Sequence, residues 1–259
     1  MRLRAVLRKE LLEMLKNKLL VGSLIPLPLI VVAIPIIFVA ATRGQPFRSD
    51  EVEIYRRLSP AFGEMDPGEI MQLVVVGQLM FMLLLTPVIG PLTIATFSII
   101  GEKQARSLEP LLATPVRTWE LLLGKSLAAI IPAVLVTWIS YLILVAGMAA
   151  VASPHVFAGV VSPMWILAIA LFSPLLGTLA VNLGVMVSSR VNDTRVAQQV
   201  GGLIVLPLIG IGIFQTAGMV LYDVRMFAFA AIGLAALDVA VLVVTARIFQ
   251  RETILTRWK

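Results

Sequence analysis

Long apolar stretches alternate with short polar segments along this chain. The longest stretch without a charged residue runs from Ser126 to Ser189, which is too long for one buried helix of a soluble protein and sufficient for two membrane spans. Further uncharged stretches cover Leu19–Ala41 and Ile70–Ile100. The pattern predicts an all-α membrane protein, a single domain over 1–259, with six transmembrane helices at 19–41, 71–100, 126–151, 163–188, 198–221 and 227–246.

Prolines occur in five of these six predicted helices, and we expect those helices to bend. The first apolar stretch holds three prolines and is longer than the apolar core of a secretory signal, about 7–15 residues, which favours a retained helix. The segment 152–163 contains two Ser-Pro pairs, which predict a turn between the third and fourth helices.

Composition supports a membrane protein and excludes several kinds of chemistry. Of the 259 residues, 59% are apolar and 14% charged, where a soluble domain is about a quarter charged. The chain has no cysteine and only one histidine, His155, which excludes a Cys-based or multi-His metal site within one chain. In so apolar a chain, the net charge of +6 is better explained by membrane anchoring than by nucleic-acid binding.

Lysine and arginine are distributed unequally between the two predicted sides of the membrane. Sixteen lie on the side of the N-terminus, and only Arg43, Arg48, Arg56, Arg57 and Arg225 lie on the other. The positive-inside rule therefore predicts that both termini are cytoplasmic. The mixed charges of 42–69 predict a short surface helix on the opposite side.

Residues 1–18 form a predicted amphipathic helix that lies at the membrane interface. Apolar residues recur there at three- and four-residue spacing, and basic residues occupy the rest of the helix surface. The helix can be a basic anchor on anionic lipid, or it can also contact a cytoplasmic partner, and the two interpretations are compatible.

A second short helix is predicted between the second and third spans. Ser107 can cap it, Glu109 lies in its first turn, where the helix dipole favours an anion, and Pro115 ends it. One face of this helix carries three leucines, Leu108, Leu111 and Leu112. Exposed leucines flanked by charged residues are typical of a protein docking surface, although a loop packed against neighbouring helix ends fits the same residues.

The segment SLEPLLATPV (107–116), with Glu102-Lys103 before it and Gly124-Lys125 after it, resembles the signature of type-2 ATP-binding cassette (ABC) transporter permeases. The six-span plan and the leading amphipathic helix match that family as well. The chain departs from the family at Arg106-Ser107, where Gly-Thr is usual, so the turn that enters the helix differs.

The resemblance implies that segment 102–119 is a coupling helix seated on a separate cytoplasmic ATPase subunit, with residues 1–18 as the connecting helix beside it. That partner would use ATP and Mg²⁺, and this chain would bind no cofactor itself. The resemblance also implies a second permease copy, as a homodimer or a paralogous heterodimer, in the inner membrane of a prokaryote. The residues expected to carry the coupling are Glu102, Lys103, Arg106, Ser107, Leu108, Glu109, Leu111 and Leu112.

Gly124-Lys125-Ser126 matches the end of a nucleotide-binding P-loop but is not one. Trp119 stands where the P-loop requires its first glycine, and no strand precedes it. We interpret Lys125 instead as the inner boundary of the third span, with its amine reaching the interface.

Asp238 is the ionisable residue placed well inside a predicted span, where an unpaired charge is costly. It can belong to a substrate, ion or proton path, with Asn182 as a further lining residue. Alternatively, it is a hydrogen-bonded carboxyl that braces another helix through Asn182 or Ser173.

These observations favour the membrane-spanning subunit of an ABC exporter, with membrane lipid around it and no nucleic acid. The alternative is a secondary transporter or channel that uses Asp238, although no inverted repeat supports it. A lipid-modifying enzyme would need clustered carboxylates or a nucleophile near the interface, and the sequence shows neither. The substrate is not indicated by the sequence.

Overall fold

The computed structural model describes residues 2–16, 22, 24–45, 47, 49–58, 62–63, 65–104, 118–191, 193–203, 206–207, 209–210 and 224–248. All the regular structure in these residues is helical, which confirms the all-α prediction for the described part of the chain. The elements are α1 (Arg2–Lys16), α3 (Pro26–Thr42), α4 (Ser49–Leu58), α5 (Pro67–Leu83), α6 (Thr86–Gln104), α8 (Thr118–Val151), α9 (Pro154–Val160), α10 (Pro163–Leu167), the π-helix η2 (Ala168–Phe172), α11 (Ser173–Arg190), α12 (Thr194–Gly202) and α14 (Val224–Ile248).

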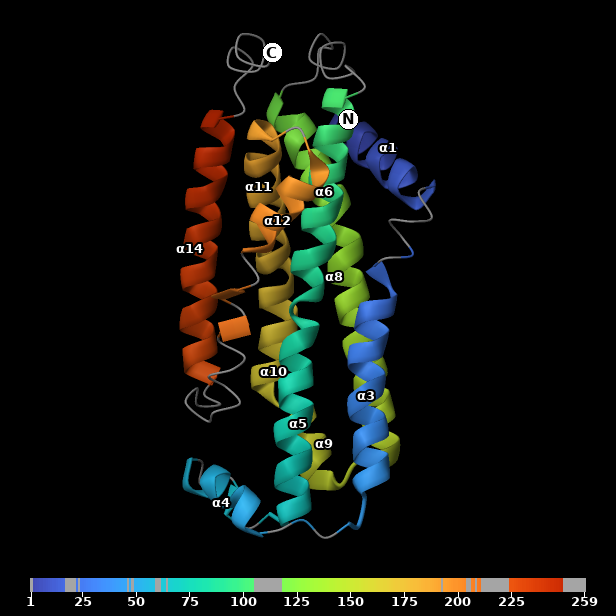
Figure 1. Ribbon diagram of the computed structural model, residues 1–259, viewed down its shortest axis with the longest axis vertical. Helices are drawn as coiled ribbons and strands as arrows, with labels where there is room; N and C mark the ends of the chain where they lie inside the picture. The colour runs from blue at the N-terminus through green and yellow to red at the C-terminus, as the bar shows by residue number, and fades with distance from the viewer. Residues whose placement is uncertain are drawn as a thin grey trace.

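The long helices run side by side along the long axis of the molecule (Figure 1). Helix α1 lies at one end, together with the C-terminal ends of α6, α11 and α14 and the N-terminal end of α8. The short helices α4 and α9 lie at the opposite end. This end therefore holds the basic residues of α1, those near the N-terminal end of α8 and those near the C-terminal end of α11. We call it the basic end.

Four helical segments are long and apolar enough to cross a membrane: Pro67–Gly101, Leu123–Val151, Pro154–Ser189 and Phe227–Thr245. Helix α3 is also apolar but has only 17 residues, fewer than the 23 predicted for 19–41. The predicted span 198–221 lies mostly outside the described residues. Multiple spans are thus supported, while the count of six and the cytoplasmic location of both termini remain predictions.

The predicted span 71–100 is divided by a break between α5 and α6 at Leu84 and Leu85. Pro87 follows directly, and proline has no amide hydrogen and clashes with the carbonyl four residues earlier. Leu84 and Leu85 donate instead to the carbonyls of Phe81 and Met82, at 3.1 and 3.0 Å. The proline thus coincides with a local break in the helical hydrogen bonding of this segment, while the bend itself stays a prediction.

A second irregularity is the π-helix η2, directly before Pro174. The carbonyl of Ile169 accepts hydrogen bonds from the Ser173 hydroxyl at 2.6 Å and from the indole N–H of Trp138 at 3.2 Å. The same indole lies 2.9 Å from the Ser173 oxygen. Side chains from α8 and α11 thereby satisfy backbone groups that the irregular turn frees in an apolar surrounding.

The segment 152–163, predicted as a turn, contains the short helix α9. Ser153 caps it by accepting from the amide of Val156, and proline at its first position needs no hydrogen-bond acceptor. Ser153 also donates to Glu69 at 2.5 Å. His155 is exposed, and its ring nitrogen Nδ1 lies 3.2 Å from the same carboxylate, so the N-terminal end of α5 is fastened to α9.

Side chains of α3, α5, α6, α8 and α11 fill most of the bundle interior, and α14 contributes few. Fully buried members include Val32, Val39, Met80, Leu144 and Met148, which form one cluster between α3, α5 and α8. A smaller cluster at the basic end joins Met14 of α1 to Ile99 and Val185. Helix α1 is therefore packed into the bundle rather than only lying on the membrane surface.

Candidate functional site

The predicted coupling segment 102–119 begins in the last turn of α6 and ends in the first turn of α8. Glu102 and Lys103 belong to α6. The other predicted coupling residues lie outside the described part of the chain: Arg106, Ser107, Leu108, Glu109, Leu111 and Leu112. Their role remains a prediction, and the structure positions the two helix ends between which they lie.

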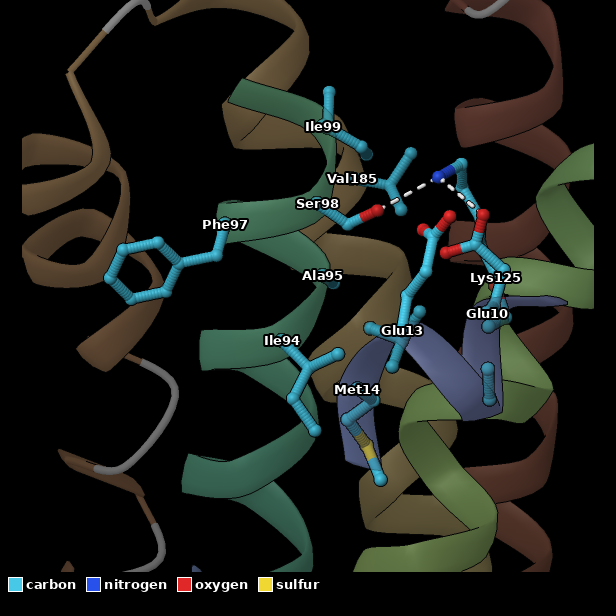
Figure 2. A pocket seen from close by; sticks show the side chains of 13 residues that line it. Glu10, Glu13, Met14, Ile94, Ala95, Phe97, Ser98, Ile99, Lys125 and Val185 are labelled. Atoms are coloured by element: carbon cyan, nitrogen blue, oxygen red, sulfur yellow. Dashed lines mark hydrogen bonds and ion pairs between the residues drawn. The ribbon is translucent and has the colours of Figure 1, made fainter. Parts of the chain in front are cut away.

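A buried ion pair joins α1 to these two helix ends. The Lys125 amine on α8 lies 3.0 Å from the carboxylate of Glu10 on α1 and 2.8 Å from the hydroxyl of Ser98 on α6. Figure 2 shows the amine between these two oxygens. The side chains of Lys125 and Glu10 are only 9% and 10% exposed. We call Glu10, Ser98 and Lys125 the three-helix junction.

This geometry corrects the interpretation of Lys125 as an interfacial lysine that reaches water. Its amine is held inside the protein because a carboxylate and a hydroxyl supply the hydrogen-bond acceptors that water would otherwise supply. Lys125 therefore connects three helices instead of only marking the end of one.

Helix α1 approaches α8 closely at Gly124. A Cβ atom added at Gly124 would lie 2.6 Å from a methyl carbon of Val6, which is too short for a normal contact. The face of α1 towards the bundle is thus formed by Val6, Glu10 and Met14, at four-residue spacing. Leu15, predicted on the same apolar stripe as Met14, is 61% exposed and lies near the basic residues of α1.

Gly124→Leu is therefore expected to push α1 off α8 and to break the contact between Glu10 and Lys125. We expect a loss of about 2–3 kcal/mol in the free energy of unfolding, in the range of other overpacked sites. Gly101→Leu is the matched control, since nothing lies within 4 Å of the corresponding Cβ position. Unfolding of both variants in lipid nanodiscs measures the difference, and equal stability of the two would contradict the close packing.

Beside the three-helix junction lies a cavity of about 260 Å³ (Figure 2). Its walls come from α1, α6, α8 and α11, and they are mainly apolar, with Met14, Ile94 and Val185 among the lining residues. Glu10, Glu13, Ser98 and Lys125 supply its polar groups.

Glu10 and Ser98 were not among the predicted site residues. A signal for Glu10 exists in the sequence, because it follows Val6 by four residues and precedes Met14 by four, on an otherwise apolar face. A carboxylate there predicts a buried partner. The sequence offers no comparable signal for Ser98, which is one of several hydroxyl residues in an apolar helix.

Asp238 and Asn182 lie apart from the three-helix junction, on α14 and α11, which pack against each other. Asp238 is 6% exposed and Asn182 is 4% exposed. Neither carboxylate oxygen of Asp238, nor the side-chain nitrogen of Asn182, has a hydrogen-bond partner among the described residues. Ser173, suggested as a brace for Asp238, is bonded to Ile169 and Trp138 instead.

Long apolar helices, a packed N-terminal amphipathic helix and a polar junction at the basic end define a multi-pass helical membrane protein. A sequence model described as ABC-2 family transporter protein matches residues 4–230. The chain belongs to this family. No curated protein matches the chain.

Proposed function

We propose that this protein is the membrane-spanning permease subunit of an ABC exporter. ATP, with Mg²⁺, would be hydrolysed by a separate cytoplasmic ATPase subunit, and a second permease copy, identical or paralogous, would complete the transport path. The complex would lie in the inner membrane of a prokaryote, with the basic end in the cytoplasm and the exposed basic and leucine residues of α1 among lipid headgroups.

The three-helix junction is the observation that carries this proposal. A force applied by an ATPase subunit to residues 102–119 reaches α6 and α8 first, because these helices flank the segment. Lys125 ties both helices to α1 through Ser98 and Glu10. The three helices are thereby built to move together, which is what a coupling element requires.

The proposed cycle is a rigid-body form of alternating access. ATP binding would close the two ATPase subunits, bring the two coupling segments towards each other and tilt the two permease copies. A path along their interface would then open outward. Asp238 and Asn182 are the polar residues that we propose for each copy's part of the path.

The first experiment is affinity purification of the chain from its native cells in nanodiscs, with identification of the accompanying cytoplasmic proteins. We expect an ATP-binding subunit in near-stoichiometric amount. Leu111→Asp/Leu112→Asp is expected to remove at least 90% of it, because two charges replace the apolar residues that dock. The matched control is Ile54→Asp, which places the same charge on an exposed apolar residue of α4, at the opposite end of the bundle.

Retention of the ATP-binding subunit by Leu111→Asp/Leu112→Asp would contradict the docking role of this segment. Recovery of the chain alone, under conditions that preserve other membrane complexes, would contradict the ABC proposal itself. That outcome would favour a carrier that uses the buried Asp238.

A further inference from the structure

The buried carboxyl of Asp238 has no counter-charge on the helices that pack against it. Among the described elements, α14, which carries Asp238, packs mainly against α11, α10 and η2. Arg190, at the end of α11, is the only charged residue in these three elements. Between Arg195 and Arg225 the sequence contains no lysine or arginine at all.

The remaining cations on α14 itself are distant along the helix. At 1.5 Å per residue, Arg225 lies about 20 Å and Arg247 about 13 Å from Asp238. An ionised carboxylate in an apolar surrounding needs a partner charge, and the described residues of the helices packed against α14 supply none nearby. The carboxyl is therefore either neutral by protonation or balanced by a cation that comes from outside these helices.

The surface between α11 and α14, which we call the α11–α14 seam, holds further polar groups. Thr245 of α14 lies 3.4 Å from the carbonyl oxygen of Asn182, which places Asn182 at the seam. The side-chain nitrogen of Asn182 is buried and has no partner among the described residues. Asp238 lies seven residues before Thr245 on α14, about 10 Å along the helix, so it belongs to the same helix contact but at a different level from Asn182.

Helix α14 is also the candidate span with the smallest buried share. Only 11% of the apolar stretch in Phe227–Thr245 is buried, against 44–61% in the other three candidate spans. Large apolar side chains such as Phe229, Ile232 and Val239 are exposed on its outer surface, where lipid would surround them. Among the described elements α14 packs mainly against α11, so a displacement that opens the seam to the membrane has to break the α11–α14 contact.

We propose that the α11–α14 seam binds an organic cation, an apolar molecule with one positive charge that enters from the membrane when α14 moves away from α11. Asp238 is its counter-ion, and Asn182 is a further polar residue of the seam. This inference rests on the proposed transport function and gives it a substrate class. The apolar body of the ligand would remain among the side chains of α11 and α14.

The test is equilibrium binding to the full chain in nanodiscs of neutral phosphatidylcholine, without ATP or any partner. Tetraphenylphosphonium is the probe, and tetraphenylborate is the matched anion of nearly the same shape. After subtraction of binding to empty nanodiscs, we expect saturable binding of the cation only. Asp238→Asn is expected to weaken it at least about tenfold, and Asp238→Glu is expected to retain it within about threefold.

Val239→Ala is the matched control, because Val239 adjoins Asp238 in the sequence but is exposed on the outer surface of α14. This variant should bind tetraphenylphosphonium with the same affinity as the unmodified chain. Folding of every variant is checked by size-exclusion chromatography and circular dichroism. Equal cation affinity with and without the Asp238 charge would overturn the proposal, as would absence of saturable binding to the folded chain. The assay contains no ATPase, so its outcome is independent of the purification experiment.

Discussion

Lys125→Met is expected to lower the free energy of unfolding by about 3–5 kcal/mol, the range measured when one partner of a buried ion pair is removed. The cost arises because the Glu10 carboxylate would lose its buried cation, keeping only the half-exposed Lys9 amine at 3.8 Å, and the Ser98 hydroxyl would lose its donor. Chemical unfolding of the purified chain in nanodiscs measures this loss. In complexes with the ATPase subunit, the same variant should weaken coupling, since α1 would no longer follow α8.

Two variants separate the role of the pair from a general loss of charge. Glu10→Gln/Lys125→Met removes both charges and should recover most of the stability, because no unpaired charge is left buried. Arg57→Met breaks an ion pair to Glu53 whose side chains are 78% and 49% exposed, and it should cost at most about 1 kcal/mol. If Lys125→Met and Arg57→Met were equally stable, the buried geometry of the junction would be wrong.

The apolar pattern predicts the positions of the long helices because each must present about 20 apolar residues to lipid, a requirement that depends on local sequence alone. Proline positions likewise predict the bend at Pro87, since the missing amide hydrogen acts within one helical turn. Helix α9 was predicted as a turn because its Ser-Pro pairs favour turns, but the same pairs also cap and begin a short helix.

The three-helix junction depends on contacts between residues far apart in the chain. Glu10 and Lys125 are separated by 115 positions, and a single sequence does not indicate which acidic residue meets which basic one. Lys125 was therefore interpreted from its position at the end of an apolar stretch, which is wrong for the amine, and α8 itself begins seven residues earlier, at Thr118. The predicted leucine face of the coupling segment concerns local spacing only, and it falls outside the described residues.

The contrast between the two polar sites suggests a division of roles within one copy. At the three-helix junction every buried group has a partner, which suits a connection that must transmit force without changing. In the α11–α14 seam the buried groups of Asp238 and Asn182 lack partners, which suits a contact that opens. The most exposed of the candidate spans carries the unsatisfied carboxyl.

Reversing two charges of the coupling segment, Glu102→Lys/Glu109→Lys, is expected to uncouple ATP hydrolysis from movement of the permease. Like charges placed against each other across a protein interface cost several kcal/mol, which is enough to disfavour seating by more than tenfold. The chain has no cysteine, so Ala158→Cys on the exposed surface of α9 provides a single labelling site at the end opposite to α1. Spin labels there report the distance between the two permease copies.

In the complex with the copurified ATPase, ATP is expected to change this distance for the unmodified coupling segment. In Glu102→Lys/Glu109→Lys the change should disappear while the ATPase subunit keeps hydrolysing ATP. Glu53→Lys on α4 is the control, since it reverses an exposed charge far from the basic end. An unchanged response to ATP in the double variant would contradict coupling through 102–119, and it would direct attention to α1, the other element exposed at the basic end.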